Sequence, residues 1–426
     1  MTTICGIDFG TSNSTVGILK DGTFAMVPVE GTHTTVPSAI FHPADGAMAL
    51  YGRAGIEAYN ARESGRLMRS LKSILGSSLV DEKTGVGGRY RTFEEILVGF
   101  LINLKAKAEA FAGERIVAVV MGRPVHFVDD NPAADRRAEE KLGSIARQAG
   151  FETVLFQYEP IAAALQFEQE LDREELVFIA DIGGGTSDFS VVRLGPSRRG
   201  QHDRGGDILA NGGVRVGGTN LDTQLSLAAV MPLLGKGIMI RKGRDLPAWP
   251  FVDLATWHRI HTIAEPKTLT ALRQLQVEIG GNPLFERYMG VVREQSGHLI
   301  AKRVEDAKIK LSAAAEAVID LDVVEAGLAV RARRRGLDTC IAGDVERIAH
   351  AITSTLAAAD VGPDNITSVF LTGGTSAVPA IRRAICAPFI NARVAEGDLF
   401  CSVGHGLALD AQRRITSSSR RTVLTK

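Results

Sequence analysis

The chain has 426 residues, of which 45% are hydrophobic and 23% charged, which predicts a folded protein of two or three domains. Its 49 basic side chains balance 49 acidic ones, so charge gives no reason to expect nucleic acid as a partner. The amino terminus lacks the pattern of a secretory leader, and no apolar run approaches the roughly 18 residues of a membrane-spanning helix. We therefore expect a cytoplasmic protein that does not cross a membrane.

Strands and helices alternate along the chain. Apolar runs predict strands at 4–7, 15–19, 116–121, 176–181, 189–194 and 368–372, and a helical pattern covers 133–149. This alternation predicts a mixed α/β fold. The Arg- and Gly-rich residues 196–218 predict a long exposed hairpin or loop. Residues 246–266, which include both tryptophans, predict an irregular insertion, and residues 417–426 a frayed tail.

The cysteines give no sign of a metal site. They lie far apart and form no C-x-x-C pair: Cys5, Cys340, Cys386 and Cys401. We therefore expect reduced thiols, as in a cytosolic protein, and no zinc.

Two distant segments echo each other: CGIDFGTSNSTVGIL near the start and IADIGGGTSDFSVVRL from Ile179. In each, a strand ends in an aspartate, a glycine-rich turn with hydroxyls follows, and a second strand begins. Glycine lets phosphate oxygens approach backbone N–H groups, and hydroxyl and amide side chains add donors. The predicted phosphate-binding residues are Gly10, Thr11, Ser12, Asn13, Gly183, Gly184, Gly185 and Thr186.

The two aspartates predict a metal. Asp8 and Asp181 would repel phosphates unless a divalent cation lay between, and hydrated Mg²⁺ suits this position. A Walker-type loop is excluded, because no lysine follows the glycines and strands, not helices, come next. The alternative is that each segment is an ordinary tight hairpin, since glycine beside Asp or Asn is common turn chemistry.

Three segments together resemble the nucleotide-binding domain of Hsp70 chaperones, within the actin, hexokinase and Hsp70 superfamily. IDFGTSNS and DIGGGTSD are similar to that family's two phosphate loops, and FLTGGTSAVPAI to its adenosine motif. YEPIAAAL, RVGGTNLD and VEDAKIKLS favour Hsp70 over actin or a sugar kinase. The resemblance implies that ATP or ADP is bound by the loops together with Gly217, Gly218, Glu305, Lys308, Ser312, Gly373, Gly374 and Thr375.

The resemblance also implies a reaction and a fold. Asp8 and Asp181 would hold Mg²⁺, while Glu159, Asp188 and Thr186 would position the attacking water. The expected fold has two lobes, each with an RNase H-like mixed sheet. The expected boundaries are 1–175 with a smaller subdomain at about 37–111, 176–405 with an insertion at about 227–312, and a closing helix and tail at 406–426.

Three departures from the family pattern shape the functional expectation. We expect the lysine that contacts the transferring phosphate well before the segment RSLKSILG, yet no lysine lies between Gly52 and Leu71. Ala377 stands where the family has an arginine stacked on adenine. The chain also ends where an Hsp70 nucleotide domain ends, which resembles truncated Hsp70-related proteins of bacteria and implies no client-peptide domain of its own.

The expected function is therefore a slow ATPase with nucleotide-dependent lobe closure. It would act as a chaperone-like or regulatory switch through an unknown protein partner that docks on the lobes. Two alternatives stay open at this point. A small-molecule kinase of the sugar type would use the same loops, and a non-catalytic nucleotide sensor would fit the missing lysine.

Overall fold

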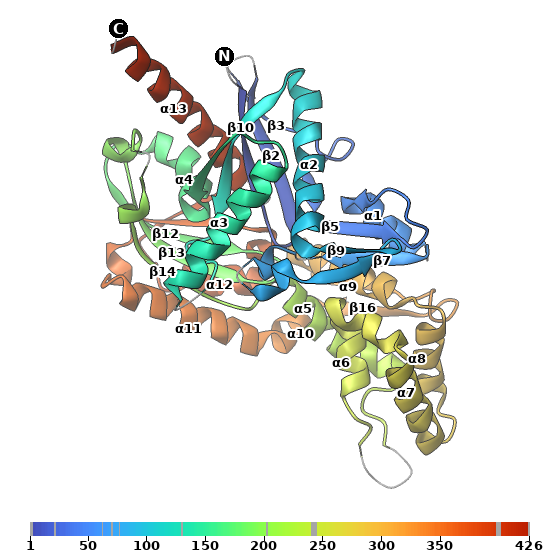
Figure 1. Ribbon diagram of the computed structural model, residues 1–426. Coiled ribbons are helices and arrows are strands. Elements are labelled where there is room, and N and C mark those ends of the chain that lie inside the picture. Colours follow the sequence, from blue (N-terminus) through green and yellow to red (C-terminus); the bar gives the residue numbers. More distant parts are fainter. Residues whose placement is uncertain are drawn as a thin grey trace.

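The computed structural model describes residues 3–424 except 21–22, 62, 70, 76, 129–130, 202, 240–244 and 398–401. The chain forms two lobes, each built on one twisted mixed sheet (Figure 1). The first sheet has the order β11-β10-β1-β2-β3, with β4 also pairing with β2. Its strands are β1 (Thr3–Phe9), β2 (Asn13–Lys20), β3 (Thr23–Met26), β4 (Thr35–Pro37), β10 (Ile116–Arg123) and β11 (Thr153–Tyr158).

The second sheet repeats this plan. Its order is β14-β13-β12-β17-β18, formed by β12 (Glu175–Ile182), β13 (Ser187–Leu194), β14 (Ile208–Val214), β17 (Ser368–Thr372) and β18 (Arg393–Glu396). In each sheet an antiparallel hairpin, β1–β2 or β12–β13, lies beside a parallel strand, β10 or β17. The structural repeat agrees with the echo between the two segments of sequence.

Helices cover the sheets, and two of them join the lobes. The long helices are α2 (Phe93–Ala112), α3 (Pro132–Gln148), α4 (Glu159–Glu170), α11 (Ala342–Ala358), α12 (Pro379–Cys386) and α13 (Ser402–Leu424). A capping box of Thr92 and Glu95 starts α2, and Gly113, with φ of 80°, ends it. Helices α4 and α13 share one buried core with strands of both sheets, through Ile161, Leu407 and Ile179. This shared core joins the lobes at their base.

Each lobe carries an additional group of smaller elements outside its large sheet. In the first lobe it contains β5 (Ala39–Pro43), β6 (Leu50–Tyr51), α1 (Gly52–Asn60), β7 (Gly65–Arg69), β8 (Lys83–Val86) and β9 (Arg89–Thr92). In the second it contains α5 (Gly218–Leu225), α6 (Trp249–Ala255), α7 (Pro266–Ile279), α8 (Pro283–Arg293), α9 (Gly297–Ala313), β15 (Glu316–Asp320), β16 (Ala329–Arg333) and α10 (Arg334–Cys340). Helices α6 to α8 project from the body of the protein (Figure 1).

The predicted strands and the predicted helix are confirmed, and so is the mixed α/β class. The described cysteines, Cys5, Cys340 and Cys386, are free thiols, and Cys401 lies outside the described residues. Over the part of the chain that the structure describes, no helix has the length and apolar character needed to cross a membrane.

Three expectations about irregular segments need correction. The hairpin expected at 196–218 is present, because β14 pairs antiparallel with β13, but the segment is not simply exposed. Residues 196–218 hold β14 and two short 3₁₀ turns, and Arg204 is only 1% exposed because it pairs with Glu168 of α4 at 2.8 Å. Composition indicated a solvated loop, but a buried ion pair offsets the cost of burying charge. Residues 246–266 form α6 and a 3₁₀ helix, Trp257–Ala264, and the carboxyl-terminal helix continues to Leu424.

The crossing of α13 over α4 depends on a residue without a side chain. A Cβ atom at Gly406 would lie 1.7 Å from the carbonyl oxygen of Ala162. We expect Gly406→Ala to lower the free energy of unfolding by about 1–3 kcal/mol, because the helices must separate. The measurement is urea unfolding followed by circular dichroism.

Gly343 of α11 provides the matched control, since a Cβ there meets nothing within 4 Å. Gly343→Ala should leave the protein as stable or raise its stability by about 0.5–1 kcal/mol. Equal effects of the two substitutions would contradict the close packing of α13 on α4.

Candidate functional site

The first glycine loop is a tight turn between β1 and β2 that a neighbouring strand holds in place. The Ser38 hydroxyl donates to the carbonyl of Gly10 at 2.6 Å, and the Ser38 backbone N–H donates to the carbonyl of Ser12 at 2.9 Å. A Cβ at Gly10 would lie 2.2 Å from the carbonyl oxygen of Asn13, so the turn requires glycine there. Sequence reasoning missed Ser38, which fixes the shape of this loop.

The second glycine loop, between β12 and β13, is held by two of the other motifs. The carbonyl of Gly183 accepts from the backbone N–H of Gly218 at 3.0 Å and from the hydroxyl of Thr375 at 2.9 Å. The carbonyl of Gly184 accepts from the backbone N–H of Thr219 at 2.8 Å. These hydrogen bonds fix the second loop to the first residues of α5 and of the 3₁₀ turn that begins at Gly374.

The two loops meet across the cleft. A Cβ at Gly184 would lie 2.5 Å from the Ser12 hydroxyl oxygen. A Cβ at Gly217 would lie 2.5 Å from the backbone of the second loop, so RVGGTN packs directly against it. The structure thus brings together the glycines and hydroxyl groups that the sequence assigned to phosphate binding. Their meeting argues against the alternative of two unrelated hairpins.

Carboxylates from both lobes converge on the floor of this cleft. Loss of hydration and the charges of Asp188, Glu159 and Asp8 together raise the pKa of Asp181 to about 8, although Lys72 lowers it. Loss of hydration and the charge of Glu159 likewise raise the pKa of Asp8 to about 7. The carboxylates therefore outnumber the positive side chains near them. Such an arrangement favours binding of a cation.

A buried lysine lies beside these carboxylates, which the expectation of a missing cation did not foresee. Lys72 lies on a 3₁₀ turn, Leu71–Ile74, where it is 9% exposed, and its Nζ is 2.5 Å from Oε1 of Glu159. Burial alone would lower the pKa of Lys72, but Glu159 and Asp8 outweigh burial and raise it. The Lys72 ammonium therefore stays charged. This lysine belongs to the segment RSLKSILG itself, whereas we expected a lysine earlier in the chain.

Glu159 opens α4, with Tyr158 as the N-cap and Pro160 in the first turn. A carboxylate in the first turn is stabilised by the helix dipole. Across the cleft, the Thr186 hydroxyl donates to Oδ2 of Asp188 at 2.8 Å. The predicted water-positioning carboxylates, Glu159 and Asp188, both lie close enough to Asp181 for their charges to raise its pKa.

The three predicted adenosine residues on α9 share one face but differ in environment. Lys308 is buried: its Nζ is 2.9 Å from a carboxylate oxygen of Asp222 and donates to the carbonyl of Gly218 at 3.0 Å. Glu305 is half-exposed and within reach of Lys302 at 3.1 Å, and Ser312 is half-buried. Sequence reasoning missed Asp222, four residues after Gly218, whose partner is 86 residues away along the chain.

The backbone of the predicted adenosine motif lies close to the carboxylate of Asp181. Gly373 has φ of 78°, and a Cβ there would lie 2.6 Å from Oδ1 of Asp181. Gly374 and Thr375 follow in a 3₁₀ turn. Thus the motif from Phe370, both loops and RVGGTN occupy one continuous site between the lobes.

The family model for Hsp70 protein matches residues 4–230 and 293–397, which together are most of the chain. The chain belongs to the Hsp70 family. Members of this family bind ATP or ADP and Mg²⁺, so the chain is an Hsp70-like nucleotide-binding protein. The segment between the matched parts, 231–292, contains both tryptophans and the projecting helices α6 to α8.

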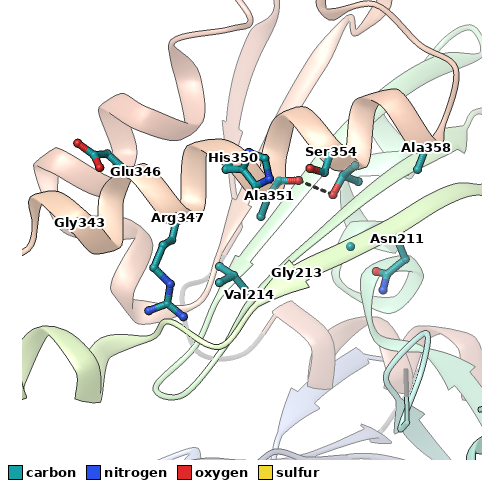
Figure 2. A pocket seen from close by; sticks show the side chains of 12 residues that line it. Asn211, Gly213, Val214, Gly343, Glu346, Arg347, His350, Ala351, Ser354 and Ala358 are labelled. Atoms are coloured by element: carbon teal, nitrogen blue, oxygen red, sulfur yellow. Dashed lines mark hydrogen bonds between the residues drawn. The ribbon is translucent and has the colours of Figure 1, made fainter. Parts of the chain in front are cut away.

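A separate hollow lies on the outside of the second lobe. It has a volume of about 690 Å³ and lies between the edge strand β14 and helix α11, where Arg347 and His350 extend over Val214 (Figure 2). None of the nucleotide-site residues that the sequence predicted lines it. The candidate nucleotide site is therefore the cleft and not this hollow.

The raised pKa values give a testable pH dependence. Asp181 stays protonated in the folded protein up to about pH 8 but ionises near 3.8 when unfolded, so folding binds a proton in between and stability falls as pH rises. Without nucleotide, we therefore expect Asp181→Asn to be more stable than the parent, by a margin that grows from pH 5 to pH 8. Thermal unfolding at several pH values measures this margin.

Asp364, exposed in a short turn, is the matched control, and Asp364→Asn should show no such growing margin. A constant difference between Asp181→Asn and the parent over the same pH range would mean that Asp181 is ionised throughout.

Proposed function

We propose that this protein binds Mg-ATP and Mg-ADP between its lobes and hydrolyses ATP slowly, as a chaperone-like or regulatory switch. The observation that carries the proposal is the meeting of the two glycine loops at Ser12 and Gly184, each loop next to a carboxylate of raised pKa. Gly10, Thr11, Ser12 and Asn13 would hold the phosphates from one side, and Gly183, Gly184, Gly185 and Thr186 from the other.

The adenosine would lie between α9 and the segment from Gly373. Glu305 and Ser312 offer accessible hydrogen-bonding groups on one helical face. Lys308 is engaged by Asp222, so it would shape the pocket by holding Gly218 in place. Gly217, Gly218, Gly374 and Thr375 would let the backbone approach the nucleotide.

Mg²⁺ fits the carboxylates of Asp8 and Asp181. Among the described residues, no group of three or more His, Cys, Asp or Glu side chains is arranged to hold a metal on its own. Mg²⁺ commonly uses one or two carboxylates and takes its other ligands from water and phosphate. When bound, it would neutralise phosphate charge, and the same two carboxylates would lose their raised pKa.

Hydrolysis requires a positioned water and a cation facing the phosphate that leaves. Glu159, oriented by Lys72, and Asp188 with Thr186 could hold a water by hydrogen bonds. The Lys72 ammonium would stabilise the charge that develops on the transferring phosphate. Turnover would be slow, because lobe motion regulates members of this superfamily.

The position of Lys72 bears on the alternatives. The non-catalytic sensor was supported by a missing lysine, and that support is gone. A small-molecule kinase would need a base facing a substrate hydroxyl, whereas Glu159 and Asp188 are engaged by Lys72 and Thr186. Hydrolysis is therefore the reaction that the residues favour. The free thiols of Cys5, Cys340 and Cys386 favour a reducing compartment such as the cytoplasm.

Replacing Glu159 tests the reaction. Glu159→Gln keeps the shape of the side chain but cannot accept a proton, so we expect single-turnover ATP hydrolysis to slow by about 100-fold or more. The affinity for ATP should change little, because this group faces water and not the nucleotide. Rapid-quench kinetics and calorimetry measure the two quantities.

The control is Glu109→Gln, which breaks a similar Lys–Glu pair at 2.5 Å on α2, away from the cleft. It should hydrolyse ATP like the parent. Parent-like hydrolysis by Glu159→Gln would remove Glu159 from the reaction.

A contact between the lobes, here called the aromatic latch, supports the proposed lobe closure. It consists of Tyr59 and Arg69 of the first lobe and Trp257 and His298 of the second. The rings of Tyr59 and His298 are 4.8 Å apart, those of Trp257 and His298 4.5 Å, and the Arg69 guanidinium lies 4.4 Å from the Trp257 ring. Burial and Arg69 lower the pKa of His298 to about 3, so the imidazole stays neutral.

The aromatic latch should limit nucleotide release. We expect Arg69→Ala to speed release of ADP by about tenfold, because a partly desolvated cation–π contact contributes roughly 1–2 kcal/mol. The readout is energy transfer from Trp257, in a Trp249→Phe background, to a bound fluorescent ADP analogue during rapid mixing with excess unlabelled ADP. Arg335→Ala, at an exposed arginine of α10, is the control. An unchanged release rate in Arg69→Ala would show that the latch does not restrain opening.

A further inference from the structure

A second hollow lies in the first lobe, and none of the predicted nucleotide-site residues lines it. It has a volume of about 470 Å³ between the β5–β7 strands and the β8–β9 hairpin, and is called here the basic groove (strands in Figure 1). Its lining includes His42, Arg66, Arg89, Tyr90 and the glycines of the hairpin turn. No aspartate or glutamate lines it.

Positive charge accumulates in this groove without carboxylate partners. His42 and Arg66 lie opposite each other on paired strands, and Arg91 lies opposite Thr84 on the hairpin. Within the described part of the chain, Arg66, Arg89 and Arg91 form no ion pair within 4.0 Å. Clustered cations without counter-charges repel one another, and an anionic ligand would relieve that repulsion.

One cation of the groove, Arg66, is held in position by the protein itself. Arg66 donates to the hydroxyl of Thr84 and, at 3.3 Å, to the carbonyl of Gly85, which links β7 to β8. Both bonds use one end of the guanidinium, and its other nitrogens keep their donors. The pKa of His42 is lowered by burial and by Arg91 and Arg66, so the imidazole is neutral near pH 7.

His42 adds an observation of a different kind. Its Nε2 is buried and has no hydrogen-bond partner among the described residues. A buried polar atom without a partner is costly, and a ligand carboxylate would supply the partner. The nearest acidic residue in sequence, Asp45, turns away: its Oδ1 accepts from the backbone N–H of Ala47 at 2.9 Å.

The spacing of the cations indicates the shape of the ligand. Arg89 and Arg91 are two residues apart on β9, so they share one face about 7 Å apart. Alternate residues of an extended peptide have the same spacing. We propose that the basic groove binds an extended segment of a partner protein that carries carboxylates at alternate positions. A duplex or a long single strand would need a longer basic track than one hairpin offers.

The test is fluorescence anisotropy of the full chain with a labelled peptide of alternating Glu and Ser. We expect saturable binding that weakens with added salt. Arg89→Ala, combined with Arg91→Ala, should weaken it by about tenfold, since each accessible ion pair contributes up to about 1 kcal/mol. Nucleotide affinity should not change, because neither arginine lies in the cleft, and this keeps the outcome separate from that of the proposed ATPase function.

Three controls complete the experiment. Arg137→Ala, at an exposed arginine of α3, should bind the peptide like the parent. A Gln-Ser peptide of equal length should not bind. Thermal unfolding should show that the double variant is folded. The proposal is overturned by no saturable binding to folded parent, by equal binding to the double variant, or by tighter binding of an oligonucleotide or of inorganic phosphate than of the acidic peptide.

Discussion

The floor of the cleft holds more carboxylates than it can neutralise. Four carboxylates from both lobes repel one another here: Asp8, Glu159, Asp181 and Asp188. The ammonium of Lys72 offsets part of their negative charge. Without a ligand, protonation of two of these groups lowers the repulsion. A bound cation with phosphate would do the same without protons. The stability of the protein is therefore linked to pH and to ligand through one set of side chains.

Positioning this charge requires the fold on both sides. The repeated β-hairpins place an aspartate at each strand end, and the glycines between them allow the two loops to approach within contact distance. Helices α4 and α13 join the lobes at the base, while the aromatic latch joins them at the mouth. The cleft thus has one fixed side and one side held by a few contacts, which is the arrangement expected of a closing hinge.

The sequence predicted the features that local pattern controls. Strand periodicity and Gly–Asp turns identified both loops, and the resemblance to Hsp70 pointed to Glu305 and Lys308 of α9. It failed where distant residues meet. Lys72 was overlooked because its partner, Glu159, lies 87 residues away, and the segment around Arg204 looked solvated because its carboxylate partner was unknown. Charge pairing across a fold leaves no periodic signal in either partner.

In the proposed function, a divalent cation joins the carboxylates of Asp8 and Asp181 to the phosphates of a nucleotide. The most direct measurement is calorimetric titration of the protein with ATP near pH 8, first with Mg²⁺ and then with a chelator. We expect binding with Mg²⁺ and a loss of affinity of at least about tenfold in the chelator, because phosphates then face unshielded carboxylates. Equal affinity in both conditions, or no heat at millimolar ATP with folded protein, would contradict the account.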